Sequence, residues 1–264
     1  MNGAETVLIT GASSGIGLEL AKCFVADGSR LVLVARNEAA LNTLAEELRQ
    51  KTKNEIVVLP ADLSLPEAPK QILEKLAAKK ISVDVLVNNA GFGLHDEFAS
   101  LPLARQLEII KVNITALTEL TGLVLPEMLK RRAGGILNVG SVAGFVPGPR
   151  LAIYYASKAF VQSFSEALAE ELDGTGVSVT VLCPGPTETN FGTVARGGKA
   201  RVMQTKKMSA EAVARYGHFA FRHKQVIAVP GFQNRAMVFL TRLLPRRTVR
   251  RMVNSYNKFR DEDI

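Results

Sequence analysis

Several kinds of residue are scarce in this sequence. Its 264 residues include no tryptophan, three histidines and two cysteines. Cys23 falls in a predicted helix and Cys183 in a predicted strand, so we interpret both as small buried side chains rather than as a disulfide or metal ligands. No carboxylate or cysteine cluster accompanies the histidines, and no metal site is expected.

The chain also lacks sequence features that would divide or export it. We find no repeat of fixed period, no linker rich in proline, glycine or serine, and no basic segment leading into a long apolar signal sequence. We therefore expect a single domain over residues 1–264 with a basic amphipathic extension from about residue 232. A cytoplasmic, reducing location fits the two unpaired cysteines.

Acidic residues are scarce after residue 190 as a whole. Residues 1–190 hold 17 Lys and Arg against 21 Asp and Glu, and residues 191–264 hold 16 against 4, which together give the net charge of +8. Beyond Phe232, apolar residues and arginines alternate around Pro245 in a pattern too short and too charged to span a bilayer. This tail could pack on its own domain, lie on an anionic membrane surface or cover a neighbouring subunit. It has no basic motif interleaved with aromatics, so nucleic-acid binding is not expected.

Short apolar runs alternate with helical patterns along most of the chain. We predict strands at 6–10, 30–35, 56–59, 83–87, 135–139, 178–182 and 225–229, and helices at 15–26, 38–51, 66–79, 103–132, 151–172 and 209–223. The strands are apolar throughout, as in parallel sheets that helices cover on both faces. The fold class is therefore α/β, with a doubly wound, seven-stranded parallel sheet of Rossmann type. Ligands of such sheets bind beyond the carboxyl ends of the strands.

A glycine-rich loop follows the first predicted strand. Its sequence, Thr-Gly-Ala-Ser-Ser-Gly-Ile-Gly over residues 10–17, differs in spacing from the usual G-x-G-x-x-G fingerprint. Gly11 permits a sharp turn, Gly15 lets the backbone approach a pyrophosphate, and Gly17 lets the next helix pack closely on the sheet. The loop therefore predicts a phosphate site at a helix N-terminus, although a plain strand-to-helix turn is the alternative.

Polar residues follow the next strands. Arg36 is placed to pair with the 2′-phosphate of NADP and to stack on adenine, or it is only a solvated loop charge. Asp62 either accepts a hydrogen bond from the adenine amino group or begins a turn. Asn88-Asn89-Ala90-Gly91 permits tight turning against a ligand. We also expect an apolar pocket near the strand ends, formed by Phe92, Leu94, Val142, Phe145 and Phe191, with His95 at its mouth.

Ser141 follows the fifth predicted strand, and a tyrosine and a lysine lie in the helix after it. Tyr154 and Lys158 are four residues apart, so they share one helix face. With the loops above, these residues resemble the classical short-chain dehydrogenase/reductase (SDR) family. The resemblance covers roughly residues 5–230 and is carried by residues 10–17 and 88–91, Asn113, Ser141, Tyr154, Lys158 and Pro184-Gly185.

The resemblance implies a role for each catalytic residue. Tyr154 is the acid/base, Lys158 its partner, Ser141 the donor to the substrate oxygen and Asn113 the holder of a proton-relay water. It also implies a homodimer or homotetramer. The cofactor contacts that we predict are Gly11, Ser13, Ser14, Gly15, Ile16, Gly17, Arg36, Asp62, Leu63, Asn89, Ala90, Gly91, Tyr154, Lys158, Pro184, Gly185, Thr187 and Thr189.

These residues suit the reduction of a carbonyl group. A carbonyl that accepts hydride develops negative charge on oxygen, and Tyr154 and Ser141 can donate to it. We expect the Lys158 ammonium to lower the pKa of Tyr154 from about 10. Ser13-Ser14 lacks the basic residue of many NADP-preferring relatives, which leaves Arg36 as the main reason to expect NADP(H) rather than NAD(H).

The sequence therefore predicts an NADP-dependent oxidoreductase that acts on a small-molecule carbonyl compound, apolar by preference, and on the corresponding alcohol. The alternative is a nucleotide-binding sensor or scaffold protein without turnover.

Overall fold

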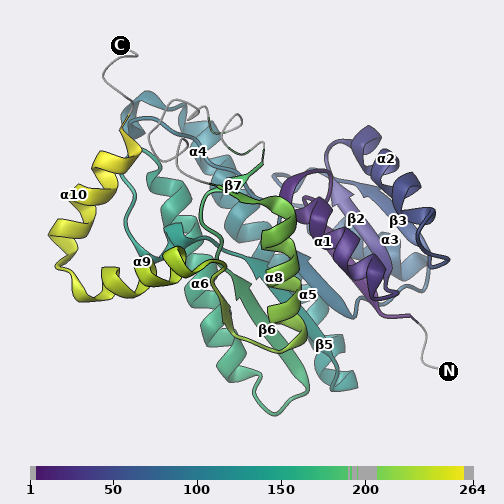
Figure 1. The fold of residues 1–264 in the computed structure, drawn as a ribbon. Helices are drawn as coiled ribbons and strands as arrows, with labels where there is room; N and C mark the ends of the chain where they lie inside the picture. The colour runs from purple at the N-terminus through teal and green to yellow at the C-terminus, as the bar shows by residue number, and fades with distance from the viewer. Residues whose placement is uncertain (1–3, 190, 192–194, 196–206, 259–264) are drawn as a thin grey trace.

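The core of the protein is a seven-stranded parallel sheet (Figure 1). The computed structural model describes residues 4–189, 191, 195 and 207–258. The sheet has the order β3-β2-β1-β4-β5-β6-β9. Its strands are β1 (Thr6–Thr10), β2 (Arg30–Ala35), β3 (Ile56–Pro60), β4 (Val85–Asn88), β5 (Gly134–Val139), β6 (Val177–Leu182) and β9 (Ile227–Ala228). The predicted doubly wound, seven-stranded parallel sheet is confirmed.

Helices cover both faces of the sheet. One face carries α1 (Gly15–Ala26), α2 (Glu38–Arg49) and α8 (Ala210–Arg222), and the other carries α3 (Ala68–Ala78), α5 (Ala116–Arg131) and α6 (Ala152–Glu171). Further elements of the described residues are the short ribbon of β7 (Thr187–Glu188) and β8 (Met208–Ser209), the helices α4 (Leu103–Ile110), α9 (Phe232–Leu243) and α10 (Arg246–Asn257), and the 3-10 turns η1 (Phe98–Ser100) and η3 (Val142–Phe145).

Alternate residues of each strand supply two separate cores. In β1, Val7 and Ile9 pack with α1, α2 and α8, whereas Leu8 packs with α3 and α5 on the other side of the sheet. Because successive side chains of a strand point to opposite faces, a strand that helices cover on both sides is mostly apolar on both faces. This is the physical reason for the uninterrupted apolar runs.

One predicted helix is interrupted. Residues 103–132 were expected to form a single helix, but a π-helical turn, Lys111–Thr115, separates α4 from α5. Such turns insert an extra residue into the helix and occur often at functional sites. The stretch 103–131 has the length and composition of a membrane span, but Leu120, Val124 and Met128 pack into the sheet core, so we interpret it as a core helix.

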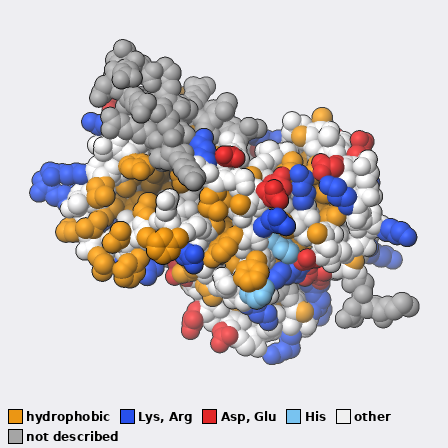
Figure 2. All heavy atoms as spheres, in the orientation of Figure 1, with side chains coloured by type: hydrophobic (Ala, Val, Ile, Leu, Met, Phe, Trp, Pro, Cys, Tyr) orange, Lys and Arg blue, Asp and Glu red, His pale blue; other side chains and the backbone are white. Residues whose placement is uncertain are grey.

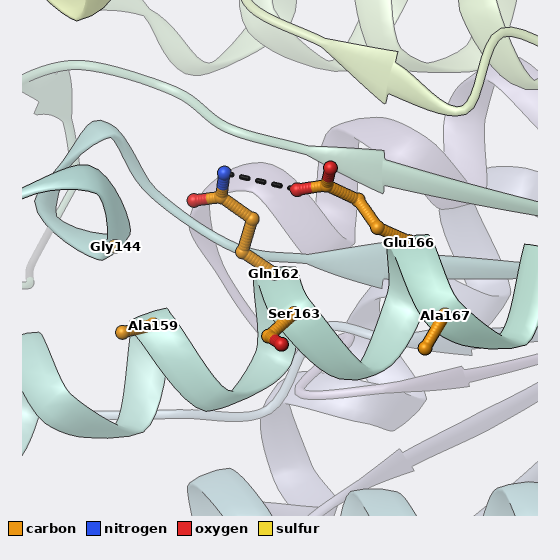
Figure 3. A pocket seen from close by; sticks show the side chains of 6 residues that line it. All are labelled: Gly144, Ala159, Gln162, Ser163, Glu166 and Ala167. Atoms are coloured by element: carbon orange, nitrogen blue, oxygen red, sulfur yellow. Dashed lines mark hydrogen bonds between the residues drawn. The ribbon is translucent and has the colours of Figure 1, made fainter. Parts of the chain in front are cut away.

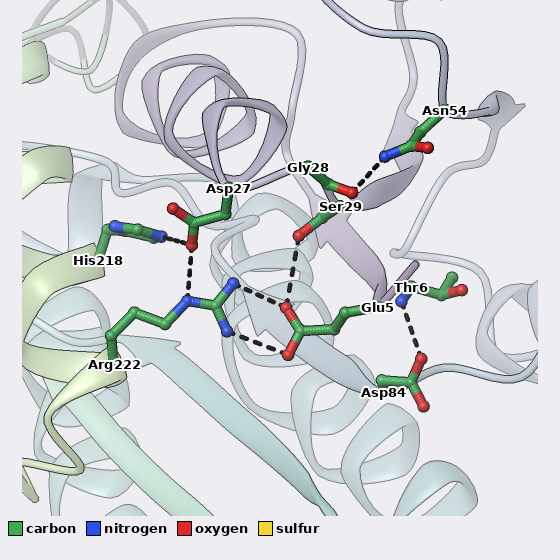
Figure 4. A network of polar contacts seen from close by, with 9 residues as sticks. All are labelled: Glu5, Thr6, Asp27, Gly28, Ser29, Asn54, Asp84, His218 and Arg222. Atoms are coloured by element: carbon green, nitrogen blue, oxygen red, sulfur yellow. Dashed lines mark hydrogen bonds and ion pairs between the residues drawn. The ribbon is translucent and has the colours of Figure 1, made fainter. Parts of the chain in front are cut away.

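A polar network fixes α8 against the first strand and helix (Figure 4). The guanidinium of Arg222 donates from Nη1 and Nη2 to the two carboxylate oxygens of Glu5, at 3.0 and 2.7 Å, and from Nε to Asp27 at 2.8 Å. Nε2 of His218 lies 2.8 Å from the same oxygen of Asp27. The network therefore ties an element near the C-terminal end of the chain to the start of β1 and the end of α1.

The basic C-terminal tail packs on its own domain, one of the three arrangements that the sequence left open. Val249 and Asn257 are buried. The Asn257 amide nitrogen donates to the carbonyl of Pro149 at 2.8 Å, and its own backbone carbonyl lies 2.7 Å from Nε2 of His95. Arg150 donates to the Asn254 side chain at 2.6 Å. His95 is thus buried under α10, and its expected place at the pocket mouth is wrong.

Candidate active site

A cavity of about 1060 Å³ opens beyond the carboxyl ends of the central strands. Every catalytic or cofactor-binding residue predicted from the sequence lines it, except Gly17 and Asn113. Because the strands are parallel and in register, their ends bring together loops that are more than 170 residues apart in the chain. The topology of the sheet alone explains this convergence.

A second, shallower cavity of about 420 Å³ lies along a different face of α6 (Figure 3). It is lined by Gly144, Ala159, Gln162, Ser163, Glu166 and Ala167, none of which is a predicted site residue. The Gln162 amide nitrogen donates to Glu166 at 3.1 Å, and the amide oxygen points toward Gly144 (Figure 3). The predicted chemistry therefore belongs to the larger cavity.

The glycine loop leaves the N-terminus of α1 open to the larger cavity. Gly11 and Gly15 have φ values of +64° and +57°, a region that other residues rarely adopt. Ser14 is the N-cap of α1, but its side chain accepts no hydrogen bond from the helix. The first backbone N–H groups of α1 therefore need an outside partner, and the pyrophosphate of a dinucleotide fits that requirement.

The loop after β4 braces the glycine loop. The Asn89 amide nitrogen donates to the carbonyls of Thr10 and Gly11, at 2.9 and 3.1 Å, and the Thr10 hydroxyl accepts from the backbone N–H groups of Asn89 and Ala90 at 3.0 Å. A Cβ atom at Gly17 would overlap the Asn89 amide and the Gly11 carbonyl oxygen. Gly17 thus permits the close packing that the sequence predicted for it.

Arg36 and Asp62 stand at the cavity wall after β2 and β3. The Arg36 guanidinium is 63% exposed and lies 3.8 Å from a carboxylate oxygen of Glu108. Asp62 accepts a hydrogen bond from the backbone of Ser64 at 2.9 Å, as expected for a turn. Burial acts to raise the pKa of Asp62, but the hydrogen bonds from Ser64 and the charges of Arg36 and Arg105 outweigh it and lower that pKa. Asp62 is therefore ionised and can accept a further hydrogen bond.

Tyr154, Lys158 and Ser141 meet at the buried floor of the cavity. The Lys158 ammonium donates to the carbonyl of Val139 at 2.7 Å and lies 5.9 Å from the centroid of the Tyr154 ring. The Ser141 hydroxyl accepts from the backbone N–H of Ala143 at 3.1 Å and also bonds to Tyr154. The first two turns of α6 and the end of β5 thus hold the three side chains in one place.

Burial controls the proton affinities of this group. It raises the pKa of Tyr154 to about 12, against the opposite effect of the Ser141 hydrogen bond. It lowers the pKa of Lys158 to about 8. The expectation that the pKa of Tyr154 lies below 10 is therefore wrong for the protein without cofactor, because desolvation of the phenolate outweighs the hydrogen bond from Ser141. Tyr154 keeps its proton at neutral pH and is available as a proton donor.

Asn113 lies behind the cavity rather than in its wall. In the π turn, its amide oxygen accepts from the backbone N–H of Phe92 at 3.1 Å, and its amide nitrogen donates to the Phe92 carbonyl and the Ser157 hydroxyl, both at 3.0 Å. A Cβ atom at Gly91 would lie 3.1 Å from the Asn113 amide oxygen and 3.5 Å from the Lys158 nitrogen. Asn113 thus positions the loop after β4 beside the lysine, and its role with a relay water stays a prediction.

The outer wall of the cavity is apolar, and sequence reasoning found only part of it. Phe92, Val142, Phe145 and Phe191 line it as expected, whereas Leu94 is buried and lines no part of it. Among the residues missed are Met237, Val238 and Thr241 of α9, Leu244 directly after it, and Val249, Met252, Val253 and Tyr256 of α10. The only available signal was that α9 is apolar on more than one side.

The model of the family described as short chain dehydrogenase matches residues 5–199. Sulfoacetaldehyde reductase 2 of Chromohalobacter salexigens is 41% identical over 218 residues, which are 80% of this chain and 86% of that protein.

Two solved structures show the likeness in three dimensions. The short-chain dehydrogenase from Sphingobium yanoikuyae in complex with NADPH is 32% identical with a TM-score of 0.80, covering 92% of this chain and 97% of that one. A short chain dehydrogenase/reductase from Burkholderia phymatum in complex with NAD is 26% identical with a TM-score of 0.82, covering 91% and 93%. Since one relative holds NADPH and the other NAD, likeness alone does not select the cofactor.

Proposed function

Because the chain belongs to the short-chain dehydrogenase family and is an oxidoreductase of that family, we propose that it interconverts an apolar ketone or aldehyde and its alcohol with NADP(H). The observation that carries this proposal is the group of Ser141, Tyr154 and Lys158, with Ser141 and Lys158 buried, on the floor of a cavity whose outer wall is apolar. A polar floor under an apolar wall suits a substrate with one reactive oxygen on a hydrocarbon body.

The residues on the floor divide the work of the reaction. The nicotinamide, when bound, supplies the hydride. The Tyr154 phenol donates its proton to the carbonyl oxygen, and the Ser141 hydroxyl donates a hydrogen bond to the same atom as negative charge develops there. Lys158 holds the ribose hydroxyls and, as an ammonium, helps to replace the proton that Tyr154 gives up.

The preference for NADP(H) rests on Arg36. Its guanidinium faces Glu108 across 3.8 Å at an exposed position, where such a pair contributes little. A 2′-phosphate carries more charge than one carboxylate and can form two parallel hydrogen bonds with a guanidinium. We therefore propose that Arg36 turns to the phosphate when NADP(H) binds.

We also propose that the protein is a homodimer or homotetramer. The helices α4 and α5 expose a set of leucines, namely Leu103, Leu107, Leu123 and Leu129. Exposed apolar groups on neighbouring helices are typical of a subunit interface. Sedimentation of the purified protein tests this proposal.

The function is tested by titrating the protein with NADPH and NADH, followed by a panel of carbonyl compounds read by loss of cofactor absorbance. The panel contains apolar ketones and aldehydes, with sulfoacetaldehyde as the polar comparator. We expect tighter binding of NADPH and turnover of the apolar members. Turnover of sulfoacetaldehyde alone would contradict the apolar substrate, and equal binding of NADH would contradict the role of Arg36.

The variant Tyr154→Phe separates an enzyme from a sensor. It should lose turnover and keep NADPH affinity, because it removes a proton and not a binding surface. Tyr216→Phe, on α8 and outside the cavity, is the matched control and should keep both. Cofactor binding by the wild-type protein without turnover of any carbonyl would favour the sensor or scaffold alternative.

A further inference from the structure

The helix α9 is apolar on two opposite faces. One face carries Met237, Val238 and Thr241, which line the cavity together with Leu244 directly after the helix. The other carries Phe232, Phe239 and Leu243, which follow one another at intervals of seven and four residues and are 79%, 61% and 67% exposed. A helix at a protein surface normally turns a polar face to water. The outer face of α9 is therefore built for a partner.

The partner must accept strong positive charge as well as apolar groups. Residues 232–258 contain no aspartate or glutamate, and their cations are Arg235, Arg242, Arg246, Arg247, Arg250, Arg251 and Lys258. Figure 2 shows hydrophobic side chains gathered over α9 and α10, with Lys and Arg side chains at the outer edge of α10. A second copy of the chain, bound through the same surface by two-fold symmetry, would bring these like charges together. An anionic lipid surface accepts both the positive charge and the apolar side chains.

The cavity opens beside this surface. Leu244, Met252 and Tyr256 line the cavity and are also 38%, 55% and 56% exposed, so they form its rim between α9 and α10. An apolar compound dissolved in lipid would thus meet an apolar rim and an apolar wall before it reaches Tyr154 and Ser141. With only 12 residues each, α9 and α10 are too short to cross a bilayer and would lie in its interface.

We propose that α9 and α10 dock on an anionic membrane surface, with Phe232, Phe239 and Leu243 inserted among the lipids and the arginines at the headgroups. We further propose that the cavity receives its apolar carbonyl substrate from that membrane, a step that rests on the proposed function.

Docking is tested on the full chain with sedimenting vesicles, first of phosphatidylcholine alone and then with about one third phosphatidylglycerol. We expect binding to the anionic vesicles only, weakening as salt is added. Leu243→Glu should reduce partitioning by about tenfold or more. Leu65→Glu is the matched control, since Leu65 is 58% exposed and follows β3, at the sheet edge opposite β9. It should bind like wild type.

A second measurement uses the absence of tryptophan from the chain. Phe239→Trp places a single tryptophan on the outer face of α9, and Leu65→Trp places one far from it. We expect the emission of Phe239→Trp to shift to shorter wavelength with anionic vesicles and that of Leu65→Trp to stay unchanged. No sedimentation with anionic vesicles, equal binding by Leu243→Glu, or a dimer that Leu243→Glu dissociates would each overturn the docking proposal.

These experiments distinguish a failure of the docking proposal from a failure of the proposed function, because vesicle binding is measured without cofactor or substrate. Delivery is then measured as turnover of a long-chain ketone held in anionic vesicles, where Leu243→Glu should be slower than wild type. The same variant should match wild type on a water-soluble ketone, since Leu243 lines no part of the cavity. Vesicle binding without turnover of any carbonyl would reject the proposed function and leave the docking surface standing. Equal rates of both proteins on the vesicle-held ketone would reject delivery.

Discussion

Replacing Lys158 by methionine should make the protein more stable near neutral pH while removing its activity. Burial lowers the pKa of Lys158 from its ordinary 10.5 to about 8. The unfolded chain therefore binds the Lys158 proton more tightly than the folded protein does, by about 2.5 pKa units. At about pH 7 this preference lowers the free energy of unfolding by roughly 3 kcal/mol. Loss of the hydrogen bond to Val139 offsets about 1 kcal/mol of the gain.

The pH dependence of stability isolates this effect from packing changes. Between about pH 8 and pH 10.5 the unfolded chain keeps a proton on Lys158 that the folded protein has lost. Because the unfolded state binds more protons there, the wild-type protein gains stability as pH rises through this window. From about pH 7 to about pH 9.5 the gain from this one group is about 2 kcal/mol.

Urea unfolding of the protein without cofactor at these two pH values measures the gain. Lys158→Met should lack about 2 kcal/mol of the increase that wild type shows. Lys75→Met, which changes an exposed lysine of α3, should keep the wild-type increase. A Lys158→Met protein with the same pH dependence as wild type would refute the idea that the lysine is held in a desolvated site.

Three further outcomes follow from the structure. The kcat/KM of carbonyl reduction should fall above about pH 8 as Lys158 loses its proton, and a rate that stays level to about pH 10 would contradict this. In urea unfolding, Gly17→Ala should cost about 2 kcal/mol or more because its Cβ overlaps the neighbouring loop. Gly122→Ala, where a Cβ meets nothing within 4 Å, should instead add up to about 1 kcal/mol of stability, and equal effects would refute the packing argument. Asn257→Ala leaves the Pro149 carbonyl without its donor and should cost about 1–3 kcal/mol, so wild-type stability would show that this bond does not hold α10.

Much of the fold follows from patterns that act within a few residues. The apolar runs predicted the seven strands, and the helix α1 begins and ends where its glycines placed it, at Gly15 and Ala26. The last strand was predicted over 225–229 but pairs only at Ile227–Ala228. It lies at the sheet edge, where pairing with β6 alone decides its length.

The residues of the candidate site could also be predicted from the sequence, because they too depend on local patterns. A helix places Tyr154 and Lys158 on one face, and parallel strands bring Ser141 and the glycine loop to one edge of the sheet. Asn113 was also predicted as a site residue, but its position in a π turn behind the cavity was not predicted. A π turn inside an apolar helix leaves no periodic signal in the sequence.

The sequence by itself determined which local units form and which chemical groups stand at the strand ends, because helix periodicity, strand alternation and glycine geometry depend on near neighbours. Only the tertiary structure decided that Tyr154 holds its proton more tightly, that Lys158 holds its proton less tightly, and that α9 and α10 wall the cavity. Desolvation depends on every atom packed around a group, and the docking of a distant helix depends on contacts such as those of Asn257, which join residues more than 100 positions apart.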